Sequence, residues 1–423
     1  MTPAGLAPAR AVPHTERRML EFDDAQRQLA QGAAAPTRST RVPLHQAPGL
    51  VLATDIAATL DLPPADNSAM DGYALRYEDY AAAGGAHRAL PVQQIVYAGQ
   101  APAAQAPGQL TRLFTGSLMP AGADTVVMQE DTRVVGDGVE ILAEPKPGQH
   151  VRLRGEDVSA GQPLLAAGTR LEAAHVALLA SQGIAEVTVH PAVRVGILTT
   201  GDELVTPGEP RSSHQIYNSN GVMLAALVNG MGARATHVLH ARDDEASLQA
   251  ALRTLTDECD LVLSVGGVSV GDKDLVKPAL ESLGGTLALW KVRMKPGKPV
   301  AMAHVGGKPI VCLPGNPVSA YAVFTVLVTP LLRRMQGRTE IFPQVSYLTL
   351  RTPKPRHDAR EEFLRVKRVV NAGSVGELQV FDRQSSGVMS SLPWATGLAR
   401  IPAGVPVYDG EKVAYYDFRH WQA

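Results

Sequence analysis

The stretch DLVLSVGGVSVGDKDLVKPALESL, residues 260–283, decides the fold. An apolar run of strand length passes into a glycine-rich loop, and a helical pattern follows the loop. Residues 191–337 contain three further units of strand, loop and helix. Alternating strands and helices predict a doubly wound α/β domain with a mostly parallel sheet. In such a domain, ligands bind beyond the carboxyl ends of the strands.

The segments on either side of this domain carry different patterns. Residues 51–156 contain short alternating runs separated by Gly and Pro, which predicts a β-rich module. The β signal returns over residues 338–423, which predicts a small C-terminal β-barrel or sandwich. Helical patterns at residues 16–32 and 171–183 each end at a glycine. The predicted fold class is therefore α/β plus β, in several domains.

The composition excludes several classes of protein. A chain of 423 residues, 45% hydrophobic and 19% charged, is long enough for about three or four folded domains. The net charge of −1 argues against general nucleic-acid binding. Cys259 and Cys312 are too few for a disulfide framework or a Cys-rich zinc site, and both are expected to be buried. The chain has neither a run of about 18 apolar residues nor a secretory signal pattern, so we expect a cytoplasmic protein without a membrane span.

Polar or glycine-rich motifs follow all four predicted strands between residues 191 and 337. They are Thr199 to Glu203, Arg242 to Asp244, Gly266 to Asp274, and Pro314 to Pro317. Because the carboxyl ends of parallel strands meet at one edge of a sheet, we expect these motifs to converge. The N–H groups of the glycine loop suit a phosphate, although a plain β–α turn is the alternative. The loop lacks GxGxxG and P-loop spacing, which argues against an NAD enzyme or a P-loop ATPase.

Six carboxylates on these loops can form an acidic ring. They belong to Asp202, Glu203, Asp243, Asp244, Asp272 and Asp274. Oxygen ligands suit a hard cation, and we expect Mg²⁺. The alternative is a set of solvated turn carboxylates and helix N-caps, a role open above all to Asp244 and Asp272. Glu203 and Asp274 are the stronger ligand candidates because each lies in a glycine-bearing loop at a strand end.

A basic cluster lies between residues 290 and 299. In an extended segment, Lys291, Arg293 and Lys295 would share one face, with Lys298 close by. Three cations on one face repel one another unless an anion joins them. Beside an acidic Mg²⁺ site, such a cluster predicts a substrate with phosphates and a further oxyanion. The alternative is a solvated, lysine-rich edge strand.

Eight motifs occur in a fixed order along the chain. They are NSAMDGYA at 67–74, TG with PAGAD and VVMQE within 115–130, RGED at 154–157, TTGDEL at 199–204, NSN at 218–220, GGVSVGDKD at 266–274, KPGKP at 295–299 and PGNPVSA at 314–320. Together they resemble the molybdopterin molybdenumtransferases, the family called MoeA in bacteria and the E domain of gephyrin in animals. The resemblance extends from about residue 16 to the C-terminus.

The resemblance implies an elongated homodimer of four-domain subunits. Domain I would comprise residues 16–50 and 157–190, domain II residues 51–156, domain III residues 191–337 and domain IV residues 338–423. The family reaction inserts molybdate into adenylylated molybdopterin, which releases AMP and gives molybdenum cofactor. The active site would lie between domain III of one subunit and domain II of its partner.

The resemblance and the chemistry together give each candidate residue an expected role. Glu203 and Asp274 would hold Mg²⁺, with Asp243 as a further catalytic carboxylate. The phosphate linkage would be bound by Gly266, Gly267, Ser269, Gly271, Pro314, Gly315 and Asn316. Molybdate or the pterin phosphate would be bound by Lys291 and Lys295, with Arg293 as a further candidate. Lys298 would bind the phosphates of the substrate. The other subunit would contribute Asp71, Thr115 and Asp157, and the C-terminal domain would place Ser390 or Ser391 near the cleft.

Two other functions remain open at this point. Molybdopterin adenylyltransferases share the α/β domain but lack the NSAMDGYA module and the C-terminal β module, and their reaction needs ATP. A scaffold protein without turnover, as gephyrin is when it anchors receptors, would not need the acidic and basic sets. An adenylyltransferase and cofactor-accepting enzymes are possible physical partners. The residues favour neither molybdate over tungstate nor a molybdate oxygen over water as the group that attacks phosphorus.

Overall fold

The computed structural model describes residues 19–85, 88–267, 275–370 and 376–423. The predicted site residues Ser269, Gly271 and Asp274, together with Asp272, lie outside these ranges. The chain divides into two compact units, which we describe one at a time. The first comprises the chain up to Thr54, Ala167–Ala173 and Glu186–Ala423. The second comprises Asp55–Ala166 and Ala174–Ala185.

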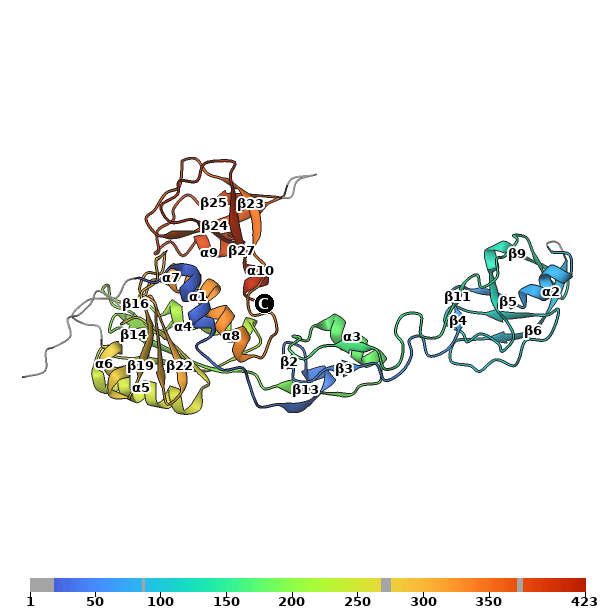
Figure 1. Cartoon of the computed structure of the whole chain (residues 1–423), viewed down its shortest axis with the longest axis horizontal. Coiled ribbons are helices and arrows are strands. Elements are labelled where there is room, and N and C mark those ends of the chain that lie inside the picture. The colour runs from blue at the N-terminus through green and yellow to red at the C-terminus, as the bar shows by residue number, and fades with distance from the viewer. Residues whose placement is uncertain (1–18, 86–87, 268–274, 371–375) are drawn as a thin grey trace, which may run out of the picture. The chain divides into compact units, whose positions relative to one another are not determined.

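A six-stranded sheet forms the centre of the first unit, in the order β17-β14-β18-β22-β21-β19 (Figure 1). Its strands are β14 (Arg194–Thr200), β17 (Arg234–Ala241), β18 (Leu261–Val265), β19 (Thr286–Trp290), β21 (Ala301–Val305) and β22 (Lys308–Leu313). The four strands predicted from the sequence pair in parallel, and β21 and β19 add an antiparallel edge. The predicted α/β layer is therefore present.

Helices cover both faces of this sheet because its strands are apolar on both sides. The helices are α1 (Phe22–Ala30), α4 (Ser219–Gly230), α5 (Glu245–Glu258), α6 (Val276–Ser282) and a continuous helix of α7 (Pro317–Val323), the π-helical η3 (Phe324–Val328) and α8 (Thr329–Met335). Val262 and Ile310 pack with α5 and α6 on one face. Leu263 and Val311 pack with α1, α4 and the long helix on the other. Alternate residues of a strand point to opposite faces, so one sheet builds two cores.

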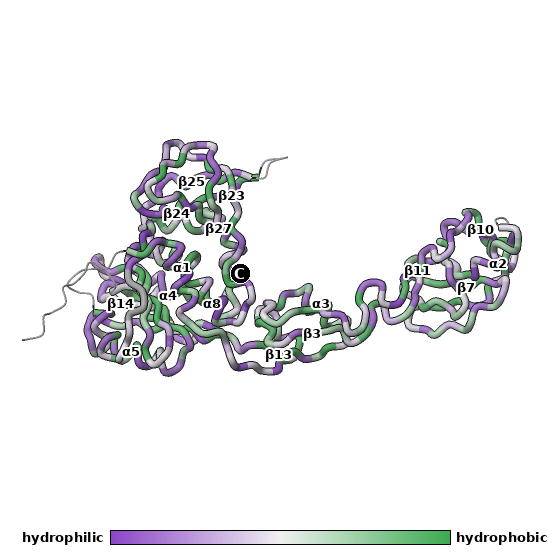
Figure 2. The backbone as a smooth tube through the Cα atoms, in the orientation of Figure 1, coloured by the Kyte–Doolittle hydropathy of each residue, from purple (hydrophilic) through white to green (hydrophobic). Residues whose placement is uncertain are grey.

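The helix from Pro317 to Met335 is long and apolar enough to cross a membrane, but 83% of its apolar window is buried inside the protein. Figure 2 shows green, hydrophobic stretches within the body of the first unit, beside purple, hydrophilic ones. The core helix of a folded protein passes the same test of length and composition, so this helix is weak evidence for a membrane span. Cys259 and Cys312 are both buried, as predicted, and neither forms a disulfide bond.

The C-terminal segment forms a closed five-stranded barrel, as one of the two predicted forms. Its strands are β23 (Ser346–Arg351), β24 (Glu361–Val369), β25 (Glu377–Val380), β26 (Gly397–Ile401) and β27 (Lys412–Asp417), with the helices α9 (Ser391–Trp394) and α10 (Phe418–Trp421). The pairing of β24 with β26 closes the barrel. The two-residue strand β20 (Met294–Lys295) adds to β24 and joins the α/β domain to the barrel.

Helix α1 packs against both the α/β core and the barrel, although the resemblance assigns its residues to domain I. The Phe22 ring lies 4.7 Å from that of Phe363 and 6.5 Å from that of Tyr416, centroid to centroid. Arg400 donates to both carboxylate oxygens of Asp23 and to Glu361. The N-terminal helix therefore ties two parts of the first unit together.

The remaining elements of the first unit are small. The strands β1 (Thr40–Pro43), β2 (Val51–Leu52) and β13 (Glu186–His190) form a sheet in the order β1-β13-β2, and η1 spans Leu44–Gln46. The strands β15 (Leu204–Val205) and β16 (Ile216–Tyr217) pair in parallel beside the α/β sheet. Helix α3 (Ala173–Ser181), predicted over residues 171–183, belongs mostly to the second unit.

The second unit is β-rich, as the sequence predicts. Its main sheet has the order β8-β5-β7-β6-β10-β9. These strands are β5 (Gly72–Leu75), β6 (Ala89–Val96), β7 (Leu110–Leu113), β8 (Thr125–Met128), β9 (Thr132–Val135) and β10 (Gly138–Ile141), with α2 (Tyr77–Ala82) and η2 (Gln129–Asp131). Two short pairs complete it: β3 (Ile56–Ala57) with β12 (Pro163–Leu165), and β4 (Asn67–Ser68) with β11 (Val151–Arg152).

Candidate functional site

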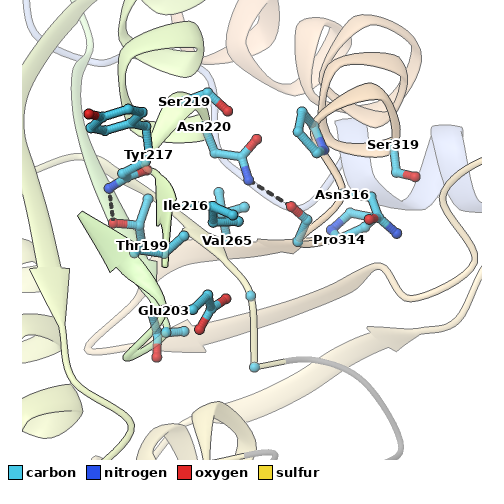
Figure 3. A pocket seen from close by; sticks show the side chains of 18 of the residues that line it. Thr199, Glu203, Ile216, Tyr217, Ser219, Asn220, Val265, Pro314, Asn316 and Ser319 are labelled. Atoms are coloured by element: carbon cyan, nitrogen blue, oxygen red, sulfur yellow. Dashed lines mark hydrogen bonds between the residues drawn. The ribbon is translucent and has the colours of Figure 1, made fainter. Parts of the chain in front are cut away.

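The four predicted strand-end motifs converge on one pocket of about 500 Å³ at the carboxyl edge of the parallel strands. Its predicted lining residues are Glu203, Asp243, Gly266, Gly267, Pro314, Gly315 and Asn316. Figure 3 shows Asn220, Asn316 and Ser319 on one side of the pocket and Glu203 on another. The convergence expected from parallel strands is therefore confirmed for the described residues.

Two glycines allow the strand ends to approach one another. Gly266 has φ +95°, and a Cβ there would lie 2.9 Å from the main-chain oxygen of Thr200. Gly201 has φ +144°, and a Cβ there would lie 2.6 Å from a carboxylate oxygen of Glu203. Both positions need glycine because of their backbone conformation and because of the space that their neighbours fill. The loops after β14 and β18 can thus line the same pocket.

Two helices begin at the pocket and give it an anion-binding character. Asn218 caps α4, since its side chain accepts from the Gly221 N–H, and it donates to the Thr199 hydroxyl over 2.8 Å. Asn220 donates to the Gly315 oxygen over 2.7 Å, and its own side-chain oxygen is buried without a partner among the described residues. The long helix starts at Pro317, directly after Asn316. Unpaired N–H groups and the helix dipole at both starts favour a negatively charged ligand.

The carboxylates of this edge have different partners. Asp243 accepts from the Thr200 hydroxyl over 2.7 Å, and the side chains of Asp202 and Asp243 each accept from the other's main-chain N–H. Asp244 caps α5 by accepting from Ser247, the role left open for it. Main-chain and hydroxyl donation by Ser247 hold the pKa of Asp244 below its ordinary value. The described residues include no hydrogen-bond or ion-pair partner for the Glu203 side chain, so its carboxylate remains available to a ligand.

A complete metal cage is absent from the part of the chain that the structure describes. No group of three or more His, Cys, Asp or Glu residues in that part is placed to hold an ion. The second predicted ligand, Asp274, lies outside it. Mg²⁺ commonly uses one or two carboxylates together with water and substrate phosphates. A single available carboxylate in a pocket suited to phosphate fits that mode of binding.

The basic cluster differs from the prediction, because residues 291–295 do not form one extended strand. Lys291 has φ +62°, and only Met294–Lys295 pairs as a strand. Arg293 pairs with Glu21, while the Lys295 amine lies 2.8 Å from Asp358 and 2.9 Å from Glu362. The expectation that the three cations share one face is therefore wrong. Arg293 gains a carboxylate partner beside α1, and Lys295 gains its partners from the C-terminal segment that forms the barrel. These ion pairs relieve the repulsion between the two cations.

The lysines proposed as anion ligands do not line the pocket in this structure. Lys298 is exposed and stands beside Pro299, which is a lining residue. The hydrogen bond with Asp358 is the main cause of the raised pKa of Lys295. Ser390 is exposed at the start of α9, and it does not line the pocket either. Its neighbour Ser391 is buried and accepts from Arg365.

In the second unit, Asp71 and Thr115 form a direct pair. Both the main-chain N–H and the hydroxyl of Thr115 donate to the same carboxylate oxygen of Asp71, each over 2.8 Å. These two hydrogen bonds, the main-chain one first, hold the pKa of Asp71 below its ordinary value of 3.8. Asp71 is therefore an ionised acceptor at neutral pH. The two motifs that contain these residues are brought together, as a shared role requires.

Backbone hydrogen bonds connect three loops of the second unit. The Ser68 N–H donates to the Ser117 oxygen, and the Gly116 N–H donates back to Ser68. The RGED loop joins the same segment, since the Arg154 N–H donates to the Asp66 carboxylate and the Asp157 N–H donates to Leu62. Segments 61–72, 114–118 and 150–157 thus form one loop cluster. The Asp157 side chain is exposed on it.

Several polar residues that line the pocket were not among the predicted site residues. They include Tyr217, Asn218, Asn220 and Ser319. Asn218 and Asn220 stand in the NSN motif and Ser319 in PGNPVSA, so a signal existed. Polar residues at a helix start usually act as caps, so these residues were not considered as pocket residues. Tyr217 has no sequence signal beyond its position before a helix.

Comparison with known families gives three matches that follow one another along the chain. The MoeA N-terminal region, described as domains I and II, matches residues 20–183. A probable molybdopterin binding domain matches residues 196–334. The MoeA C-terminal region, described as domain IV, matches residues 347–418. The matches cover the α/β domain, the barrel and the β-rich unit.

Relatives and solved structures agree with these matches. The chain is similar to a molybdopterin molybdenumtransferase of Nostoc, with 39% identity over 86% of this chain and 85% of the relative. It is 38% identical to molybdopterin molybdenumtransferase 2 of Mycobacterium tuberculosis, over 92% of this chain and 96% of the relative. A crystal structure of the molybdopterin biosynthesis MoeA protein from Pyrococcus horikoshii has a TM-score of 0.77 at 31% identity, over 96% of this chain and all of that one. The chain therefore belongs to the MoeA family, the molybdopterin molybdenumtransferases.

Proposed function

We propose that this transferase inserts molybdate into adenylylated molybdopterin, with Mg²⁺-dependent release of AMP, and so forms molybdenum cofactor. One observation carries the proposal: four strand-end loops and two helix starts meet in a single pocket of about 500 Å³. Such a pocket suits a ligand that presents several phosphate oxygens. The named activity of the relatives supports the same reaction.

The phosphate linkage of the substrate would lie against the strand-end loops. Main-chain N–H groups near Gly266 and Gly267 and the helix start after Asn316 would donate to its oxygens. The predicted continuation of this loop, with Ser269 and Gly271, would extend the same cradle. Groups fixed in advance of binding stabilise charge without reorganising during the reaction. The chain would therefore orient the linkage and stabilise negative charge that develops there.

Mg²⁺ would be held by Glu203, with Asp274 as the second proposed ligand. When bound, the ion supplies positive charge beside the phosphates. Asp243 would act through its neighbours, because its hydrogen bonds with Thr200 and Asp202 tie two strand-end loops together. Lys298 is exposed beside the lining residue Pro299, and Lys291 is half-buried. Both would bind molybdate or the pterin phosphate. Lys295 would take part in this only by exchanging its present carboxylate partners for the substrate.

The second unit would complete the site from the partner subunit of a homodimer. Asp71, Thr115 and Asp157 lie in one loop cluster of that unit. They would position the substrate across the dimer. The four-domain division with bounds at residues 50, 156, 190 and 337, the elongated shape and the cytoplasmic location belong to the same proposal. The C-terminal barrel would bring Ser390 to the cleft.

The main experiment measures AMP release from adenylylated molybdopterin, with and without molybdate and Mg²⁺. We expect release that requires both additions and yields molybdenum cofactor. An arm with ATP and unmodified molybdopterin tests the adenylyltransferase alternative. Pyrophosphate release in that arm would identify an adenylyltransferase. A protein that binds substrate but releases neither AMP in the first arm nor pyrophosphate in the second is a scaffold, and either result would overturn the proposal.

Mixed dimers test whether sites are shared between subunits. We expect Asp71→Ala and Glu203→Ala chains to be inactive alone. Refolded together at equal amounts, they would regain roughly a quarter of wild-type activity, because half of the dimers are mixed and each mixed dimer has one intact site. No recovery, with dimers confirmed by tagged pull-down, would place the whole site in one chain.

A further inference from the structure

Asp71 lies at an edge where three strands of the second unit meet. It directly precedes β5, and β7 and β8 pair with β5 in antiparallel fashion on its two sides. Thr115 follows the end of β7, and Gln129 directly follows β8. Because antiparallel neighbours run in opposite directions, the start of β5 shares one edge with the ends of β7 and β8. Arg112, on β7, contacts all three segments, and none of the roles proposed above uses it.

The guanidinium group of Arg112 donates to two residues that adjoin Asp71. One terminal nitrogen donates to the main-chain oxygen of Gly72 over 3.1 Å, and the other donates to the side-chain oxygen of Gln129 over 2.5 Å. The main-chain N–H of Gln129 in turn donates to the main-chain oxygen of Asp71 over 3.0 Å. The planar fork of Arg112 therefore connects the residue after Asp71 with the residue that holds the carbonyl group of Asp71.

Two aromatic rings hold the same guanidinium group in place. Its central carbon lies 5.0 Å from the ring centroid of Tyr73 and 4.9 Å from that of Phe114. Tyr73 and Arg112 are partners across β5 and β7, so their side chains share one face of the sheet. The Phe114 ring stacks on that of Tyr97, with centroids 4.8 Å apart and an angle of 8° between the planes. Attraction to the two ring faces adds to the hydrogen bonds and restricts the orientation of the guanidinium.

The positive charge of Arg112 acts on the Asp71 carboxylate. Among the described residues, no Asp or Glu side chain forms a hydrogen bond or an ion pair with Arg112. The two hydrogen bonds from Thr115 are the main causes of the lowered pKa of Asp71, and the charge of Arg112 lowers it further. Phe114, which contacts the guanidinium, directly precedes Thr115. The hydrogen bonds, a ring contact and the charge of Arg112 thus all lead to Asp71 or to the residue that holds its carboxylate.

We propose that Arg112 is a positioning residue for the Asp71 carboxylate. The inference rests on the proposed function, in which Asp71 orients the substrate from the partner subunit. Arg112 would fix the main chain at Asp71 and Gly72, and its charge would favour the ionised carboxylate. A displacement of about 1 Å at a group that positions a substrate can cost about 100-fold in rate. A purely structural arginine would stabilise the sheet without affecting how the substrate is held.

The kinetics of AMP release and an NMR titration of the Asp71 carboxyl carbon test the proposal together. Arg112→Met should raise the KM for adenylylated molybdopterin by about tenfold, with a smaller fall in kcat, because the carboxylate that orients the substrate is less well placed. It should also raise the pKa of Asp71 toward its ordinary value of 3.8. Arg112→Lys keeps the charge but lacks the fork that reaches both acceptors. It should leave the pKa of Asp71 near the wild-type value and still raise the KM several-fold.

Two control variants separate positioning from stability. Gln105→Ala removes a buried side chain that accepts from Thr111 near the start of β7, the end of that strand away from Thr115. It should lower the melting temperature but leave the KM and the pKa of Asp71 unchanged. Arg88→Met removes an exposed cation from the same unit and should change none of the three quantities.

An Arg112→Met protein with a wild-type KM and an unchanged pKa of Asp71 would overturn the proposal, and so would an equal rise of the KM in Gln105→Ala. If Arg112→Met does not fold, Gln129→Ala, which removes one acceptor of the fork, decides the question. A raised KM in that variant supports the proposal, and a wild-type KM overturns it. A wild-type protein without AMP release would contradict the proposed function instead. The pKa of Asp71 in Arg112→Met would then decide alone, since a raised value supports the contact and an unchanged value excludes it.

Discussion

Glu203 and Asp71 are proposed site carboxylates in different units, and the structure holds them differently. Glu203 lies at a strand end of the α/β domain, lines the pocket and has no partner among the described residues. Asp71 lies in a loop cluster of the β-rich unit, where two donors of Thr115 hold one of its oxygens. The first is placed by the sheet, and the second by hydrogen bonds between loops.

The difference shows what each kind of placement is suited to do. A carboxylate without a protein partner can accept a cation or a substrate donor at little cost. A carboxylate held by two donors keeps one oxygen fixed, which suits it to orient a neighbour. We therefore expect the α/β edge to supply the reacting charges and the loop cluster to supply position. The predictions below test that division, from the largest expected effect to the smallest.

Glu203→Ala should lower the rate of AMP release by a factor on the order of 100 or more, because a charge-stabilising group is lost from the pocket. The melting temperature should stay near that of the wild type, since the carboxylate has no partner in the described structure. The measurement is single-turnover AMP release at saturating Mg²⁺.

Glu209→Ala is the matched control, because Glu209 is exposed on the same connection but does not line the pocket. It should retain full activity. Near-normal turnover of Glu203→Ala would show that this residue takes no part in the reaction. The proposed difference in role between Glu203 and Asp71 would then be wrong as well.

Gly266→Ala should destabilise the first unit by about 2 kcal/mol or more, because it adds a main-chain clash to an unfavourable backbone conformation. Its Cβ would lie 2.9 Å from the Thr200 oxygen. Gly116→Ala in the second unit is the matched change, with φ +82° but nothing within 4 Å of the added Cβ. It should cost about 1 kcal/mol. Urea unfolding, followed separately for the two units, measures the loss of stability in each variant. Equal losses in the two variants would show that the strand ends at Gly266 and Thr200 are not tightly packed.

Lys295→Met should destabilise the first unit by about 1–2 kcal/mol, because it leaves Glu362 without its cation and Asp358 with Arg360 alone. The expected loss of stability is smaller than for a fully buried ion pair because the lysine side chain is 40% exposed. The raised pKa of Lys295 means that the loss is complete below pH 10.5 and disappears as the pH rises through the folded-state pKa.

Lys298→Met is the contrasting variant, because Lys298 is exposed beside the pocket. It should leave stability unchanged and raise the molybdate concentration needed for half-maximal AMP release. If Lys295→Met alone raises that requirement while stability stays constant, then Lys295 is a substrate ligand and its carboxylate pairs belong to the unliganded state.

Thr115→Val should raise the pKa of Asp71 toward 3.8 but not beyond it, because the main-chain N–H of residue 115 still donates. The lowered pKa of Asp71 contributes stability above pH 3.8 that is lost as the pH falls through the folded-state pKa, and the variant should lose less. An NMR titration of the Asp71 carboxyl carbon measures the shift. An unchanged pKa would show that the hydroxyl does not hold the carboxylate.

The sequence predicted the elements of the site better than their contacts. Strand patterns gave the α/β layer and the convergence of Glu203, Gly266 and Asn316, because parallel strands end at a common edge. The prediction for the basic segment was wrong because it assumed extended geometry for residues 291–295. It also could not include the partners of Lys295, which are distant in the chain. No local pattern could indicate that Asp358 and Glu362 would lie beside it.

By itself, the sequence determined the order of α/β and β segments, the family and the identity of the strand-end motifs, because periodicity and local turns encode these over short distances. Only the tertiary structure decided that the Glu203 carboxylate has no partner among the described residues while the Lys295 amine has two. The partners of these side chains are distant in the chain, and only folding makes them neighbours.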